Sequence, residues 1–182
     1  LLPRARSGKG EAYNLEAQVA ARTLSADIAY LDPPYNQHKY LGNYHIWETL
    51  VRWDAPEAYG GGRKRIDVKE RKSAFNGKRR ILGAMKEVID ALDVRHLVVS
   101  FNNEGHISRD EMVELLSTRG EVFVIERDFK RYVGAQIGIY NPDGDKVGAV
   151  SHLKNKEFLF IVPERPDDLD LPSEMFHAVN AS

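Results

Sequence analysis

The chain has 182 residues, of which 42% are hydrophobic, and a net charge of -1. This length suits one domain with a sizeable core but not two large domains. Because the sequence contains no cysteine, disulfide bonds, a thiolate nucleophile and cysteine-ligated metal sites are excluded. It has no 18-residue apolar run and no secretory leader, so we expect a cytoplasmic protein without a membrane partner.

Two elements are expected before a proline-containing turn. Residues 14–24 are rich in alanine and carry apolar side chains at helical spacing, which predicts a helix. Residues 27–31 form a short apolar run, which predicts a strand buried in a parallel sheet. Two successive prolines cannot continue the strand and bias the residue before them to extended geometry. The strand is therefore expected to end at the stiff turn Asp32-Pro33-Pro34-Tyr35.

The next part of the chain is strongly basic. Apolar spacing over residues 43–53 predicts a helix, with Trp47 and Trp53 expected in the core. Residues 63–80 contain nine basic and two acidic residues and so carry a net charge of +7. We expect residues 55–80 to form a basic mobile loop that binds nucleic-acid phosphates, since neutralising phosphates releases counterions. A solvated surface loop is the alternative. The candidate phosphate-binding residues of the loop are Arg63, Lys64, Arg65 and Lys72.

The second half of the chain alternates helices and strands. Apolar spacing predicts two helices, over residues 78–92 and 108–117, the second with a capping box formed by Ser108 and Glu111. Short apolar runs predict strands over residues 96–101, 121–126 and 158–162, and a turn is predicted over residues 141–144. This order predicts an open α/β sheet with an antiparallel end. We expect one domain over residues 1–163 and an acidic peripheral tail over residues 164–182.

Polar residues follow the predicted strand at 96–101. Carboxyl ends of strands in open α/β sheets form ligand crevices, so Asn102 and Asn103 are candidates to line one. They could equally do no more than end the strand. Neither they nor the histidines of the chain form a metal-ligand pattern, so we expect no metal in the chemistry.

The turn at Asp32 suits chemistry at an amino group on an aromatic ring. The lone pair of such a group is delocalised into the ring, which makes the nitrogen a poor nucleophile. A carboxylate and a carbonyl that accept its hydrogen bonds, here from Asp32 and Pro33, would raise its electron density in a preorganised pocket. A base rotated out of a duplex loses its stacking, which the Tyr35 ring could replace. An ordinary strand-to-loop turn with a capping aspartate is the alternative.

Several elements in the same order resemble the D12 class of adenine-N6 DNA methyltransferases. They are Asp32-Pro33-Pro34-Tyr35 with Asn36-Gln37-His38, Asn43-Tyr44-His45, Lys72-Ser73-Ala74-Phe75-Asn76, and Ser100-Phe101-Asn102-Asn103-Glu104-Gly105. The resemblance implies site-specific methylation of adenine N6 in double-stranded DNA, with S-adenosylmethionine as methyl donor, within a restriction-modification system. It implies that Asp32, Pro33, Pro34 and Tyr35 are catalytic and that Asp32 and Asn14 lie near the donor. It also implies DNA contacts by Lys130 and Arg131 and a nucleoid-associated location.

One departure from that family concerns its donor-binding Phe-x-Gly-x-Gly turn. The family places this turn and three strands before the catalytic tetrapeptide, and residues 1–31 contain no such motif. We therefore expect the C-terminal part of a class I (Rossmann-like) α/β methyltransferase sheet, with an antiparallel end hairpin. Its missing N-terminal strands would lie in a missing N-terminal segment or on a second chain. A non-catalytic DNA-binding or specificity module with a remnant methylase fold, and an RNA amino-group methyltransferase, are the alternatives.

Overall fold

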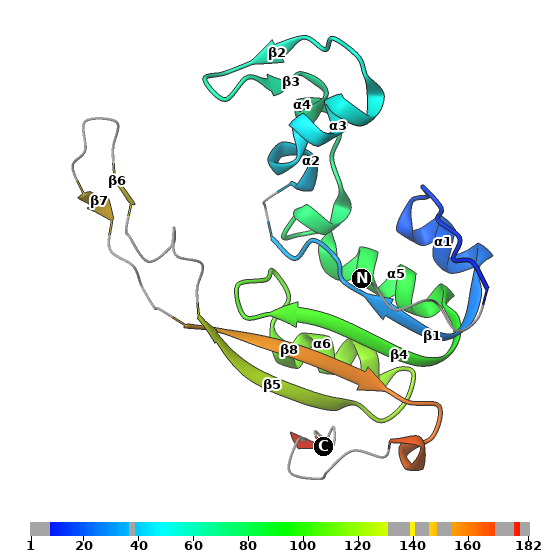
Figure 1. Cartoon of the computed structure of the whole chain (residues 1–182). Coiled ribbons are helices and arrows are strands. Elements are labelled where there is room, and N and C mark those ends of the chain that lie inside the picture. Colours follow the sequence, from blue (N-terminus) through cyan, green and yellow to red (C-terminus); the bar gives the residue numbers. More distant parts are fainter. Residues whose placement is uncertain are drawn as a thin grey trace.

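A five-stranded mixed sheet forms the centre of the molecule (Figure 1). The computed structural model describes residues 8–36, 39–130, 139–140, 146–148, 154–169 and 177–178. The strand order is β1-β4-β8-β5-β9, with β1 parallel to β4 and the other neighbours antiparallel. The strands of this sheet are β1 (Ser25–Leu31), β4 (Asp93–Asn102), β5 (Phe123–Lys130), β8 (Lys154–Val162) and β9 (His177–Ala178).

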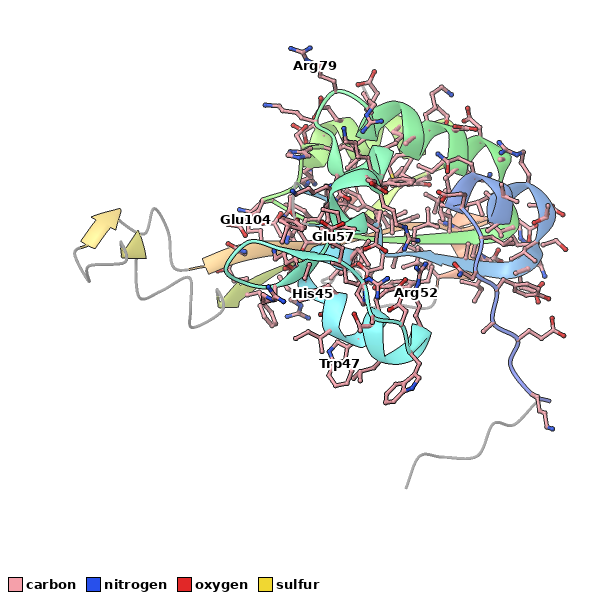
Figure 2. The ribbon with its side chains drawn as sticks, turned by 90° about the horizontal axis from the view of Figure 1, so that it is seen from above. His45, Trp47, Arg52, Glu57, Arg79 and Glu104 are labelled. Carbon is pink, nitrogen blue, oxygen red and sulfur yellow. The ribbon has the colours of Figure 1, made fainter. Side chains whose placement is uncertain are left out.

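Three helices cover one face of the sheet: α1 (Ala17–Thr23), α5 (Ile81–Ala91) and α6 (Arg109–Ser117) (Figures 1 and 2). The core lies between these helices and the inward side chains of the strands. Burying one such side chain contributes about 1.5–3 kcal/mol, so this layer supplies most of the stabilisation. Its largest fully buried side chains are Phe101, Phe160, Ile81, Met85, Ile89, Leu97, Met112 and Leu116.

The strand β1 lies at an edge of the sheet and was predicted incorrectly as a buried strand. Ala29 and Leu31 pack against the core, but Ile28 and Tyr30 on the opposite face are 61% and 60% exposed. Within the described residues, no strand pairs with its second edge and no helix covers that face. An apolar run signals a strand that is buried on both faces but does not show which segment covers it.

Residues 40–71 form a separate unit, here called the cap, which projects from the sheet beyond the carboxyl end of β1 (Figure 1). The predicted helix over residues 43–53 is confirmed by a helix over residues 45–52, and a separate short helix over residues 40–43 precedes it. The cap contains α2 (Tyr40–Asn43), α3 (His45–Arg52), β2 (Ala58–Tyr59), β3 (Lys64–Arg65) and α4 (Asp67–Glu70). A 3-10 helix, η1 (Ala74–Asn76), follows it. Much of the segment 55–80, predicted as a loop, thus has regular structure.

The two tryptophans of the cap lie on its surface. Trp47 is 65% exposed and Trp53 is 84% exposed, so their predicted place in the core is wrong. Figure 2 shows Trp47 pointing outward from α3. The backbone of Trp53 is left-handed, with φ of 51°, and its N–H bonds to the Thr49 carbonyl at 2.8 Å. The apolar side chains of α3 therefore face solvent in the described part of the chain.

The second half of the chain follows the prediction closely. The capping box is present, because the Ser108 hydroxyl accepts from Glu111 N–H while the Glu111 carboxylate accepts from Ser108 N–H. The predicted antiparallel pair is formed by β5 and β8 on the side of the sheet away from β1, with β8 between β4 and β5.

Two shorter features complete the described structure. β6 (Ile139–Tyr140) and β7 (Lys146–Gly148) pair antiparallel, and the turn predicted at 141–144 lies outside the described residues. In the expected acidic tail, β9 extends the sheet beside β5, and η2 (Pro166–Asp168) precedes it. Within the described residues, no helix combines the length and apolarity needed to cross a bilayer.

Candidate active site

The turn Asp32-Pro33-Pro34-Tyr35 lies at the carboxyl end of β1, as predicted. Pro33 is buried, Pro34 and Tyr35 are half-buried, and Asp32 is exposed. Asp32 lines a cavity of about 340 Å³ whose wall comprises Glu16, Ala17, Tyr30, Leu31, Asp32, Pro33, Pro34, Ser73, Phe75, Met85 and Val88. A carboxylate is thereby presented to a mostly apolar cavity by a stiff turn. Asn14 is exposed and is not part of this wall, whereas Glu16 is.

Three separate segments hold the turn in place. The Tyr35 carbonyl accepts the His106 N–H at 2.8 Å, and the Asn36 carbonyl accepts the Asn76 side-chain amide at 2.8 Å. The Tyr35 ring meets Phe101 edge to face, with ring centroids 5.6 Å apart. These contacts come from the loop after β4, from η1 and from β4 itself, so three elements fix the turn in one conformation.

Phe101, whose ring contacts Tyr35, occupies the space that a side chain at Gly105 would need. A Cβ at this position would lie 2.2 Å from Phe101 Cε1, and Phe101 is fully buried in the core. Overpacking of this kind typically costs 1–3 kcal/mol, so Gly105→Ala is expected to lower the free energy of unfolding by about 2 kcal/mol in urea denaturation. Gly83→Ala is the matched control, because a Cβ there meets nothing within 4 Å. Equal urea midpoints for wild type and Gly105→Ala would contradict this packing.

A second, smaller cavity of about 210 Å³ lies beside the Tyr35 ring. It is lined by Pro34, Tyr35, Asn36, Tyr40 and Asn43. Burial, followed by the negative charge of Glu157, raises the pKa of Tyr35, so its hydroxyl stays protonated at neutral pH. Burial and the charge of Asp32 likewise raise the pKa of Tyr40. This cavity is lined by two neutral tyrosine side chains.

Sequence reasoning missed Glu157 and left the role of Asn102 open. Glu157 lies on β8 directly opposite Asn102 on β4, and Asn102 is 3% exposed. Burial raises the pKa of Glu157, the charges of Asp32 and Glu104 add to this, and a hydrogen bond from Asn102 opposes it. Glu157 ends the polar stretch Lys154-Asn155-Lys156-Glu157 at the start of β8, so no sequence signal marked it, and only the strand register brings it to the site.

Arg65, predicted to bind nucleic acid, is instead a buried structural residue. It is 3% exposed, and its guanidinium bonds to both oxygens of Asp54, at 2.5 and 2.8 Å, and to Asp67 at 3.2 Å. It also donates to the Thr49 hydroxyl at 3.1 Å. These hydrogen bonds hold the pKa of both aspartates below their usual range. Arg65 thus ties α3, the loop after it and α4 together.

The other predicted basic residues occupy different places. Arg63 and Lys72 are exposed, Lys64 is half-buried, and Lys72 lines a cavity of about 400 Å³ with Tyr40, Ser73 and Asn76. Arg79, near the start of α5, points away from the body of the molecule (Figure 2). The side chain of Lys130 and all of Arg131 lie outside the described residues. A cavity of about 570 Å³ at the amino end of β1 contains none of the predicted site residues.

Comparison with models of known protein families shows to which family the chain is related. The model of the D12 class N6 adenine-specific DNA methyltransferases matches residues 2–115. The chain belongs to this family. The D12 match includes the turn at Asp32, the cap and the Asn102 loop, whereas Glu157 lies beyond its end. No solved structure matches the chain.

Relatives of this D12 chain include named modification enzymes. It is 36% identical to type II methyltransferase M.FokI of Planomicrobium okeanokoites over 108 residues, which are 59% of this chain and 16% of that protein. It is 30% identical to modification methylase StsI of Streptococcus sanguinis over 166 residues, or 88% of this chain and 23% of that protein. It is 25% identical to type II methyltransferase M.NlaIII of Neisseria lactamica over 150 residues, or 81% and 43%. The chain thus spans less than half the length of these relatives.

Proposed function

We propose that the protein containing this chain transfers a methyl group to adenine N6 in double-stranded DNA, as the modification enzyme of a restriction-modification system. The observation that carries this proposal is the Asp32 turn: Asp32 lines the cavity of about 340 Å³, and Pro34 of the same turn lines both this cavity and the smaller one at Tyr35. The family and the names of its relatives support the reaction class. The protein would act in the cytoplasm on the DNA of the nucleoid.

In this proposal the turn activates the amino group of the target base. The Asp32 carboxylate and the Pro33 carbonyl accept hydrogen bonds from the two N6 hydrogens, which concentrates the lone pair on nitrogen. Because proline fixes the backbone, these acceptors need no rearrangement when charge develops in the transition state. The nitrogen would then form a bond to the methyl carbon as the bond from that carbon to the sulfur of S-adenosylmethionine breaks, which leaves S-adenosylhomocysteine, and one N6 proton would pass to solvent. Tyr35 offers its ring face to the flipped base, worth about 1–3 kcal/mol of stacking.

S-adenosylmethionine would supply the electrophilic methyl group. The apolar cavity beside Asp32 fits part of such a donor, and the Glu16 carboxylate at its wall could accept hydroxyl hydrogen bonds. Among the residues lining that cavity there is no glycine turn to cradle the rest of the donor. We assign Asn14 and Glu16 to the donor side of Asp32 and the main donor-binding turn to a further part of the protein.

The free edge of β1 is where that further part would join the sheet. Its backbone groups, which pair with no strand among the described residues, and the exposed side chains of Ile28 and Tyr30 form a template for another strand and a covering helix. A class I (Rossmann-like) sheet would then continue through β1 into a preceding segment or a second chain. Titration calorimetry tests this: S-adenosylmethionine should bind the full-length protein and not residues 1–182 alone. Equal affinities would reject the assignment.

Exposed cations of the cap and of the segment just before α5 would bind the DNA backbone. Arg63, on the β2–β3 hairpin, and Arg79 are exposed, and neither has an ion pair within the described residues. Replacing both by alanine should weaken DNA binding and lower the slope of log K against log salt by about 0.9 for each phosphate that is no longer neutralised. Lys86→Ala is the control, since Lys86 is equally exposed on α5 but pairs with Asp90. An unchanged slope in the double variant would remove these residues from the interface.

The reaction itself is tested by methyl transfer from labelled S-adenosylmethionine with the full-length protein. Label on adenine N6 of duplex DNA supports the proposal. Label on cytosine or on RNA guanine would show that the proposed substrate is wrong and that the turn acts on a different amino group. Absence of transfer with retained DNA binding would favour the second candidate, a specificity module with a remnant methylase fold.

A further inference from the structure

The short helix α2 of the cap forms part of the wall of the cavity of about 210 Å³ at Tyr35. Its first and last residues, Tyr40 and Asn43, both line this cavity. Residues three positions apart on a helix lie on the same face, so one face of α2 is directed at the cavity. The rest of the wall comprises Pro34, Tyr35 and Asn36 at the Asp32 turn. The turn and the cap thus build this cavity together.

Contacts within the cap hold α2 in place. The Lys39 ammonium, just before the helix, donates to the Val68 carbonyl of α4 at 3.0 Å. Gly42 is buried against the same residue, since a Cβ at this position would lie 3.5 Å from Val68 Cγ1. The Tyr40 ring stacks on Tyr44, with ring centroids 6.1 Å apart and an angle of 27° between the planes. The α2 part of the cavity wall is therefore preorganised.

The side-chain amide of Asn43 can bind a ligand in this cavity. Asn43 is exposed, and among the residues that the structure describes, none forms a hydrogen bond with its side chain. Its backbone N–H donates to the Lys39 carbonyl at 3.2 Å. A carboxamide carries two N–H donors and one acceptor oxygen. The wall thus includes a neutral hydrogen-bond donor on the same helix face as Tyr40.

The chemistry of adenine suits such a donor. The proposed function assigns the two hydrogens of N6 to the Asp32 carboxylate and the Pro33 carbonyl. The ring nitrogens N1 and N7 lie on either side of N6, and each has a lone pair and no hydrogen, so each can accept a hydrogen bond. The volume of about 210 Å³ is below the roughly 300–1,000 Å³ of most ligand pockets. The cavity therefore suits a single base rather than a whole nucleotide.

We propose that α2 forms the cap side of the target-base pocket and that Asn43 is a specificity-determining residue. Its amide donates a hydrogen bond to N1 or N7 of the flipped adenine, and the Tyr40 ring packs on the base. A bond to N1 would reject guanine, whose N1 carries a hydrogen, and a bond to N7 would reject pyrimidines, which lack this atom. The identity of the base rests on the proposed function, whereas the pocket rests on the cavity and its lining.

Adenine analogues that lack one ring nitrogen test this hydrogen bond atom by atom. Methyl transfer by the full-length protein is measured on duplexes that carry adenine, 1-deazaadenine, 3-deazaadenine or 7-deazaadenine at the target position. Asn43→Ala should lower kcat/KM on adenine roughly 10-fold. Either 1-deazaadenine or 7-deazaadenine should cost the wild type roughly 10-fold more than it costs Asn43→Ala. The analogue without N3, which lies across the ring from N6, is the control and should cost both proteins equally. Equal costs in both proteins for all three analogues would overturn the proposal.

A second measurement does not depend on methyl transfer. The Kd of the full-length protein is compared for a duplex with the target adenine and for one with an abasic site in its place. Asn43→Ala and Tyr40→Leu should each raise Kd roughly 10-fold for the first duplex and leave it unchanged for the second. Tyr40→Phe, which keeps the ring, is the matched control and should bind as the wild type does. Equal effects of Asn43→Ala on both duplexes would overturn the proposal. If the difference between the duplexes is seen but the wild type transfers no methyl group to adenine, the proposed function fails and the base pocket stands.

Discussion

Replacing Asp32 by alanine is expected to lower the rate of methyl transfer by at least about 10²–10³-fold, the usual cost of losing one preorganised group at a reacting centre. The physical reason is that the amino group keeps a single acceptor, the Pro33 carbonyl, and its lone pair stays delocalised. Single-turnover transfer from labelled S-adenosylmethionine to duplex DNA by the full-length protein measures this loss. DNA affinity should change little, since Asp32 contributes no attraction to phosphate.

A matched control for Asp32→Ala exists on the same strand. Asp27 lies near the amino end of β1 and is exposed, with a long ion pair of 3.7 Å to Arg95. Asp27→Ala should leave transfer at the wild-type rate. Asp32→Asn should remain slow, because a carboxamide lacks the negative charge and accepts hydrogen bonds more weakly. Wild-type activity in Asp32→Ala would remove this residue from the chemistry.

Replacing Arg65 by methionine is expected to lower the melting temperature by about 5–10 °C, since the variant loses the charged hydrogen bonds that join α3, the loop after it and α4. Asp54 and Asp67 would then face each other across the cap without the guanidinium that both contact. Calorimetry of the variant measures the shift. The cap should loosen first, so α3 and the β2–β3 hairpin should lose protection from hydrogen exchange before the sheet does.

The difference in melting temperature between wild type and Arg65→Met should become smaller as the pH falls. The pKa of Asp54 and of Asp67 is lowered in the folded state, chiefly by hydrogen bonds from Arg65. Such carboxylates stabilise the fold fully above their ordinary pKa of about 4 and lose this effect as pH falls through the depressed values. The two melting temperatures should therefore converge in acid below about pH 4. A difference that grows as the pH falls would contradict the ion-pair account.

Arg63→Met provides the contrast within the same hairpin. Arg63 is exposed two residues before Arg65, so its removal should leave the melting temperature nearly unchanged while weakening DNA binding. If both variants melted alike, the distinction between a structural and a DNA-facing arginine would be wrong.

The catalytic turn could be predicted from sequence because its signals are local. Two prolines after an apolar run end a strand in any context, and the structure places Asp32 where the run ends. The capping box of α6 was equally local, since Ser108 and Glu111 lie within one helical turn. Features of this kind depend on neighbours in the chain and need no knowledge of the sheet.

Arg65 and Glu157 show why the rest could not be predicted. A run of basic residues gives a net charge, but whether one arginine faces solvent depends on Asp54 and Asp67, which the folded cap brings to it. Glu157 is 125 residues from Asp32 in the chain, and only the β4–β8 register brings it beside Asn102. Sequence spacing does not reveal the contact of Arg65 with Asp54, eleven residues away, or that of Glu157 with the site.

The exposed faces of β1 and α3 limit prediction in another way. Ile28 and Trp47 have the apolar pattern of buried positions and are exposed in the described part of the chain. Periodicity shows that a face is apolar but does not name what covers it. The expectation of core packing was therefore wrong within this chain.

The most direct test of the central claim is mass spectrometry of nucleosides from the DNA of cells that express the full-length protein, as wild type and as Asp32→Ala. We predict N6-methyladenine at a defined sequence with the wild type and none with Asp32→Ala, provided that both proteins accumulate to the same level. N6-methyladenine in both, or methylcytosine in place of methyladenine, would contradict the assignment of this turn to adenine methylation.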